Sequence, residues 1–210
     1  MGRVRGVWLA LAVALLTVLS GCVGQQSQGT SAQATAVVKR DELGALLNLS
    51  VDPRDKSLLT ATAKGVYRSA DNGQTWQSLP IPANLGRSDF SQVVVTPGDP
   101  KTVYVGGMNS GVLRSDDNGQ TWQSASNGLP TKKVGALALH STERDTVFAW
   151  LKDGGIYRSE DRGANWRFVH EGPSLTDLIL LVHSSLEGSM NTGWMYAGVP
   201  DGVYLTSDCF

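Results

Sequence analysis

The 210-residue sequence has little cysteine, no excess of charge and one long hydrophobic run. Its two cysteines are too few for a disulfide framework, which excludes the small disulfide-stapled folds. Because 18 basic residues nearly balance 19 acidic ones, the sequence lacks the basic character of nucleic-acid-binding proteins. No apolar period of 3.6 residues is sustained beyond the N-terminal run, and we therefore expect almost no helix.

The hydrophobic run lies at the N-terminus, from Val7 to Leu19, after the basic Arg3 and Arg5. It is shorter than the roughly 20 residues that a membrane-spanning helix needs, and its length is typical of a signal-peptide core. The residues Leu19-Ser20-Gly21-Cys22 follow it. They resemble the bacterial lipobox, in which cleavage precedes the cysteine and the thiol is lipidated. An ordinary secretory leader and an uncleaved anchor are the alternatives.

This resemblance implies a signal peptide over residues 1–21, a lipidated Cys22 and a protein exported to the cell envelope. Val23 stands where Asp resembles an inner-membrane retention signal in Gram-negative lipoproteins, so an outer-membrane destination stays open. The lipid would make the membrane a partner of the chain. Residues 22–42 begin with small polar side chains and are predicted to form a flexible linker. Cys209 is interpreted as a chance thiol, with an intermolecular disulfide as the alternative.

The rest of the chain is repetitive. The pattern Ser-x-Asp-x-Gly-x-Thr-Trp starts at Ser69 and Ser115, a third copy with Asn165 in place of Thr starts at Ser159, and a decayed fourth is predicted to start at Ser207. The motif residues are Ser69, Asp71, Gly73, Trp76, Ser115, Asp117, Gly119, Trp122, Ser159, Asp161, Gly163 and Trp166. A repeat of this length indicates a propeller or a solenoid.

Each repeat has three short β-rich runs, then the motif, then a fourth run that begins at the Trp. The first runs are 47–51, 92–95, 136–139 and 178–182; the second are 58–61, 102–105, 146–150 and 194–197; the third are 65–69, 111–115, 155–159 and 202–207. Four strands in about 40 to 45 residues form a propeller blade. We predict an all-β, propeller-like array of about four antiparallel four-stranded blades over residues 43–210, the last one incomplete.

The motif is identified as the Asp box, or BNR repeat. Its Asp is expected to accept hydrogen bonds from turn amides, its Gly to adopt backbone angles that other residues resist, and its Trp to bury a ring beside the turn. The repeats resemble those of sialidases, xyloglucan-cleaving glycosidases, the sortilin-type receptor domain and the photosystem II assembly-factor family. In these families the Asp box is structural and lies away from the ligand face.

We predict no catalytic residue, metal site or cofactor. The carboxylates outside the Asp boxes form no recognisable pair of the kind that glycosidases use. The repeated Arg68, Arg114 and Arg158 suggest a sialidase clamp, but their equivalent positions favour packing between blades or turns. His140 and His183 are interpreted as equivalent, solvated loop positions. A glycoside hydrolase or sialidase-like enzyme with a divergent site remains the alternative.

The predicted function is a non-catalytic, membrane-tethered extracytoplasmic binding or assembly module with a protein or glycan ligand. Propellers commonly bind through their loops, and the candidate contacts are Arg87, Asn109, Lys132 and Lys133, although each of them is also an ordinary solvated loop residue.

The blade count leaves three alternatives, since propellers close with four to eight blades. Residues 35–39 supply the missing outer strand of the fourth blade and close a ring; the array is open and self-associates through exposed blade edges; or the chain is a truncated remnant.

Overall fold

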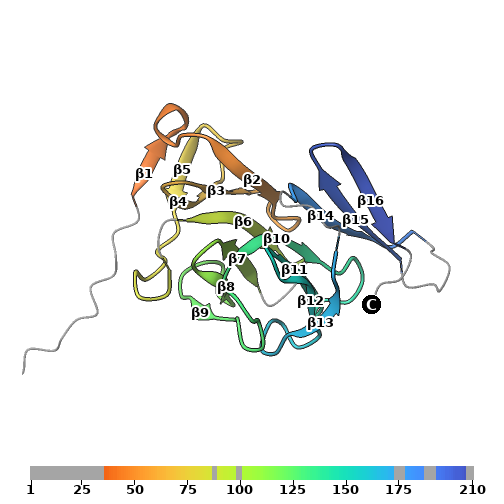
Figure 1. The fold of residues 1–210 in the computed structure, drawn as a ribbon. Helices are drawn as coiled ribbons and strands as arrows, with labels where there is room; N and C mark the ends of the chain where they lie inside the picture. Colours follow the sequence, from red (N-terminus) through yellow and green to blue (C-terminus); the bar gives the residue numbers. More distant parts are fainter. Residues whose placement is uncertain (1–35, 87–88, 98–100, 173–177, 187–192, 207–210) are drawn as a thin grey trace, which may run out of the picture. The chain divides into compact units, whose positions relative to one another are not determined.

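The computed structural model describes residues 36–86, 89–97, 101–172, 178–186 and 193–206. Cys22, Arg87 and Cys209 lie outside these ranges. The described residues form four antiparallel sheets, and the only helical segment among them is the 3₁₀ turn η1 (Arg40–Glu42). None of their segments is a helix long and apolar enough to cross a membrane. The described part of the chain is therefore nearly all β, and its four sheets are blades of a β-propeller (Figure 1).

Each sheet takes its strands from one repeat, as the sequence predicts, except that the first sheet also includes β1, which precedes the first repeat. The first contains β1 (Val37–Lys39), β2 (Leu46–Val51), β3 (Leu58–Thr62), β4 (Gly65–Ser69) and β5 (Thr75–Ser78). The second contains β6 (Phe90–Val95), β7 (Val103–Gly107), β8 (Gly111–Ser115) and β9 (Gln123–Ser124). The third contains β10 (Val134–Leu139), β11 (Val147–Leu151), β12 (Gly155–Ser159) and β13 (Arg167–His170). The fourth contains β14 (Leu180–Ser184), β15 (Trp194–Val199) and β16 (Gly202–Thr206).

The first three blades share one register, which makes their positions directly comparable. The first strand of each is bulged near its start, between Leu46 and Asn48, between Phe90 and Gln92, and between Val134 and Ala136. A bulge in the same place in each copy bends equivalent strands in the same way. Leu49, Val93, Leu137 and Leu181 occupy one repeat position, because the second-strand residue that each pairs with is itself paired with the third residue of the third strand. These third-strand residues are Tyr67, Leu113, Tyr157 and Tyr204.

The hydrophobic core lies between consecutive blades, because each interior sheet is apolar on both faces. One cluster joins Leu59 and Ala61 of the first blade to Val93 and Val105 of the second. Similar clusters join the second blade to the third and the third to the fourth. In β11 all five residues are buried, which a strand achieves only when both faces of its sheet are covered.

The segment before the first repeat does not close a ring. Its strand β1 pairs with β5 of the first blade, Val38 opposite Trp76 (Figure 1). Closure through residues 35–39 would instead require this strand to pair with the fourth blade. The structure contradicts that alternative and makes β1 a fifth strand of the first blade.

The register of the fourth blade also corrects the sequence reading. Tyr204 pairs with Ala197 as Tyr157 pairs with Ala149. Thr206, not Ser207, therefore stands at the position of Ser159, and the residues that follow Thr206 lie outside the described ranges. The first strand of this blade was predicted two residues early, because the apolar run 178–182 contains no signal that separates its loop from its strand.

Candidate functional site

The two ends of the blades carry different loops. In antiparallel sheets the connections alternate between ends, so the Asp-box turns share one end with the loops after the first strands. The opposite end, here called the loop end, carries the hairpins between second and third strands and the connections between blades. Asn109, Lys132 and Lys133 lie at the loop end, away from the Asp boxes.

The first Asp box shows how the motif builds its turn. One carboxylate oxygen of Asp71 accepts the backbone N–H of Gln74 at 3.1 Å and that of Thr75 at 2.9 Å. The Thr75 hydroxyl donates to the other oxygen at 2.6 Å. The Ser69 hydroxyl donates to Asp71 at 2.7 Å and accepts the Gly73 N–H at 2.8 Å. The turn therefore satisfies its own backbone amides with two side chains.

The tryptophan of the motif anchors each turn, but in two ways. The indole N–H groups of Trp76 and Trp122 donate to the carbonyl of their own turn glycine, both at 3.1 Å. That of Trp166 donates to the carbonyl of Ala125 in the preceding blade at 2.7 Å. The third Asp box therefore also fastens the second blade to the third.

These hydrogen bonds lower the pKa of the Asp-box carboxyl groups. Bonds from the Thr75 side chain and backbone and from Ser69 lower the pKa of Asp71 to about 2. For Asp117 and Asp161 burial acts in the opposite direction, but the hydrogen bonds of their turns outweigh it and the pKa is lowered. A carboxylate that is ionised and already accepts several hydrogen bonds cannot serve as a general acid near neutral pH.

The repeated arginines lie at the Asp-box end and pair with carboxylates there. Arg114 binds Asp116 at 2.7 Å and donates to the carbonyl oxygen of Arg162 in the next blade at 2.8 Å. Arg162 binds the same Asp116 at 2.6 Å. Arg158 binds Glu143 at 3.1 Å. These arginines therefore do not converge on one point as a carboxylate clamp would.

A buried acidic residue at this end was not singled out from the sequence. Asp52 is fully buried and lies 2.6 Å from Arg54 and 3.4 Å from Arg68. Burial opposes its ionisation, but the hydrogen bonds and charge of Arg54, with the charge of Arg68, leave the pKa lowered. The Asp52–Arg54 pair fixes the turn after β2, since the backbone N–H of Arg54 also donates to the Asp52 carboxylate.

The two histidines are neither equivalent nor solvated, in contrast to the sequence interpretation. His183 lies within β14, whereas His140 follows β10. Both are buried, and their rings stack with centroids 3.9 Å apart between the third and fourth blades. His140 Nδ1 accepts the Glu143 N–H at 2.9 Å, and His183 Nδ1 accepts the Ser141 N–H at 3.0 Å. The sequence reasoning placed them wrongly because it started the last blade two residues early.

The predicted ligand contacts are held by hydrogen bonds between loops. Asp89 accepts the backbone N–H of Asn109 and, at 2.5 Å, the hydroxyl of Ser110. The carbonyl of Lys132 accepts the Gly111 N–H at 3.1 Å, which ties the loop before β10 to the hairpin of the second blade. Asn109, Lys132 and Lys133 are exposed. The structure thus brings three of the four predicted contacts to neighbouring loops, and Arg87 lies outside the described residues.

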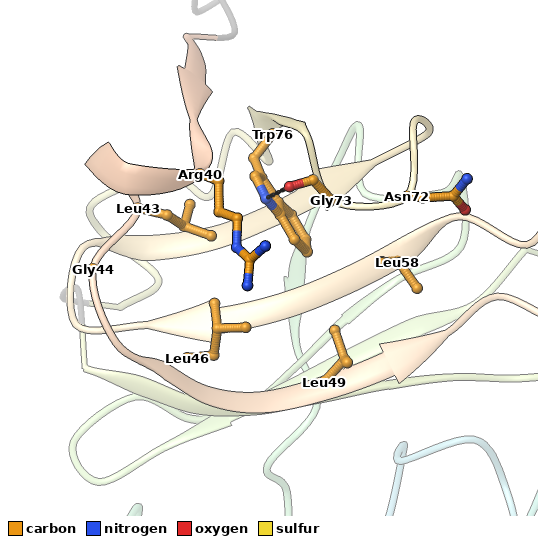
Figure 2. Close-up of a pocket in the computed structure, with 9 residues that line it drawn as sticks. All are labelled: Arg40, Leu43, Gly44, Leu46, Leu49, Leu58, Asn72, Gly73 and Trp76. Carbon is orange, nitrogen blue, oxygen red and sulfur yellow. Dashed lines mark hydrogen bonds between the residues drawn. The ribbon is translucent and has the colours of Figure 1, made fainter.

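A hollow on the first blade was missed by the sequence reasoning. It has a volume of about 360 Å³ and lies on the face that points away from the second blade. Figure 2 shows Leu46 and Leu49 below it and Leu43 and Trp76 above it, with the Arg40 side chain between them. The described residues include no cluster of three potential metal ligands there or elsewhere. This face is recognised by comparing exposure at equivalent repeat positions, since Leu46 and Leu49 are half exposed whereas their counterparts Phe90 and Val93 are buried.

A family model described as photosynthesis system II assembly factor YCF48 matches residues 44–192, which include the Asp boxes that start at Ser69, Ser115 and Ser159. The chain belongs to the YCF48 family. No curated protein sequence matches the chain.

Solved structures show the same fold at low identity. A xyloglucanase of family GH74 from Xanthomonas campestris is 22% identical with a TM-score of 0.62, and the match covers 83% of this chain and 31% of that one. An ancestral GH74 enzyme is 20% identical with a TM-score of 0.62, covering 78% and 23%. The computationally designed Ika4 protein is 17% identical with a TM-score of 0.51, covering 77% and 90%. The YCF48-family chain therefore spans a quarter to a third of these GH74 enzymes.

The Asp71→Asn variant tests the carboxylate of the first Asp box. Because the pKa of Asp71 is lowered in the folded chain, its contribution is present above the ordinary value of 3.8 and is lost as pH falls toward about 2. We expect the variant to be less stable at pH 7 and to lose less stability between about pH 4 and pH 2. Urea unfolding followed by tryptophan fluorescence measures both. Asp153→Asn at the loop end is the control, and equal behaviour of the two variants would contradict the assignment.

The His140→Asn variant tests the buried histidine stack. Burial lowers the pKa of His140 despite the nearby Glu143, so acid favours the unfolded chain, which takes up the proton first. We expect the wild-type protein to lose stability as pH falls through about 6.5, and His140→Asn to reduce this loss. The Asn oxygen still accepts turn N–H groups, as Asp52 does at the same repeat position. Thermal melts from pH 8 to pH 5 measure how the melting temperature changes with pH, and exposed His170→Asn is the control. If the melting temperature of His140→Asn falls with pH as steeply as that of the wild-type protein, the interpretation is wrong.

Proposed function

We propose that the chain is a non-catalytic extracytoplasmic binding or assembly module, held at a membrane by a lipid on Cys22. The observation that carries the proposal is its place in an assembly-factor family, whose model covers the four-stranded repeats of the first three blades. The state of the Asp boxes supports it, since their carboxylates are occupied by turn hydrogen bonds. The likeness to glycoside hydrolases concerns the fold, and unrelated activities share this fold.

The loop end is the proposed ligand surface. Its hairpins and connections are fixed by bonds between loops, such as Gly111 N–H to the Lys132 carbonyl, while Asn109, Lys132 and Lys133 expose their side chains. A rigid scaffold with exposed polar side chains can bind a ligand without a large ordering cost. The assembly-factor family favours a protein as ligand, and a glycan is the second candidate.

Photo-crosslinking distinguishes the two ends of the blades. A photoreactive amino acid at Asn109 is expected to capture a defined partner in cells, whereas the same group at exposed Gln74 in the first Asp box captures none. Lys132→Glu should reduce capture severalfold, because a charge at the rim of an interface controls encounter with the partner. Lys101→Glu at the Asp-box end is the matched control. Equal capture from both ends would contradict the proposal. So would hydrolysis of xyloglucan, measured as released reducing ends, if removing a single loop carboxylate abolished it.

The lipid anchor is tested on Cys22. In the producing bacterium, Cys22→Ala is expected to abolish incorporation of labelled palmitate and to move the chain from the membrane fraction to the soluble exported fraction. The reason is that a lipidated chain owes its stable membrane attachment to its acyl groups. Cys209→Ala, which removes the other cysteine, should keep both properties. Labelling that survives in Cys22→Ala would refute the anchor.

A further inference from the structure

The first blade has an open apolar face. Its residues Leu46, Leu49 and Val51, here called the leading face, are 50%, 54% and 52% exposed. The equivalent residues of the second blade, Phe90, Val93 and Val95, are 3%, 0% and 5% exposed, because the first blade covers them. The side chains of the leading face are thus of the type that this fold buries against a preceding blade.

The fourth blade has the opposite open face. Its residues Leu180, Val182, Val203 and Leu205, here called the trailing face, are 41% to 65% exposed. The strand pairing within the third and fourth sheets places them at the same repeat positions as four residues of the third blade: Ala136, Ala138, Ile156 and Arg158. Three of these counterparts are buried against the fourth blade: Ala136, Ala138 and Ile156.

The two faces are complementary halves of one kind of interface. Every interior contact in this chain joins the trailing face of one blade to the leading face of the next. The trailing face is also freer of charge than its counterparts, since Leu205 stands where Arg158 stands in the third blade. Burying it therefore does not require removing a charge from water.

The outer part of the same side of the first blade, beyond the leading face, is already covered. Leu43 is buried in a cluster with Trp76 and Tyr67, and Val38 of β1 packs against the same cluster. The inner part of this side, which is the leading face on β2 together with the hollow of Figure 2, stays open. The described part of the fourth sheet comprises β14, β15 and β16.

We propose that these faces bind each other between two copies of this chain, the trailing face of each copy packing on the leading face of the other. Two such contacts related by a two-fold axis close a ring, so neither copy keeps an open apolar face. The ring would contain eight blades, which is within the four to eight with which propellers close, whereas three copies would exceed it. The proposal does not depend on the ligand or on the lipid.

An inter-copy disulfide tests the contact directly. The Asn48 side chain accepts the N–H of Val93 at 3.3 Å across the first two blades, and the equivalent positions are Leu180 and Leu49. Full-length Leu49→Cys and Leu180→Cys chains, each also carrying Cys209→Ser and a different tag, are mixed in detergent micelles that outnumber the protein and then oxidised. We expect a disulfide-linked pair containing both tags. Phe168→Cys, exposed on the third blade, replaces Leu180→Cys as the control and should give none.

Two results overturn the proposal. One is the absence of a mixed-tag product. The other is a disulfide that forms only when both cysteines are in one chain, which would mean that the fourth blade packs on the first within a single copy.

A pair of opposite charges, introduced one on each face, provides a second test, in which the strength of self-association is measured. Leu49 is half exposed, so Leu49→Asp should leave the circular dichroism spectrum and melting temperature of a single copy unchanged while weakening self-association at least about tenfold. Adding Leu180→Lys should restore most of the loss, because the two charges then face each other across the interface. Sedimentation equilibrium of the full chain in detergent measures the association. A wild-type chain with the mass of one copy at all concentrations, or a Leu49→Asp chain that associates normally, contradicts the proposal.

Discussion

Every interior blade of this protein depends on having a neighbour on both faces. β11 is buried along its whole length, and its alternating side chains enter two different clusters, one with each neighbouring blade. A single four-stranded sheet with two apolar faces cannot be stable in water, so the repeats fold as an array or not at all. This constraint explains why the core consists of separate clusters between blades, and why the faces at the two ends of the array differ from the rest.

The Asp box makes that packing possible by holding each hairpin in one geometry. The Asp71 carboxylate organises its turn, Trp76 covers it, and Gly73, at a φ of 85°, occupies a conformation that a side chain would strain. The turn of the third blade is also part of the contact with the preceding blade: Trp166 donates to Ala125, and Arg162 meets Asp116. The motif thus fixes the register within a blade and the distance between blades. Its acidic groups are ionised for this structural reason.

The repeat period and strand alternation were enough to predict the fold class, the four sheets and most strand limits. They failed where the answer depends on contacts between repeats. One of the three alternatives placed residues 35–39 at the fourth blade, but β1 pairs with β5, because a short β-branched segment carries no information about which edge it joins. His140 and His183 were read as solvated, yet their burial follows from the position of β14 against β10. The open leading face was missed because Leu46 and Leu49 look like ordinary core residues until the residues that should cover them are sought.

The same neighbour relation that builds the core also builds the proposed ligand surface. Asn109 belongs to a hairpin of the second blade, while Lys132 belongs to the connection that leads into the third, and the two segments meet through the Gly111 N–H and the Lys132 carbonyl. Each stretch of the loop end is therefore shared by two consecutive blades, so a blade without a neighbour offers only half of a binding site. Pairing of the leading and trailing faces would add two such junctions to the three within each copy. Self-association and ligand binding would then be linked, because a partner that contacts a completed junction stabilises the pair of copies that forms it.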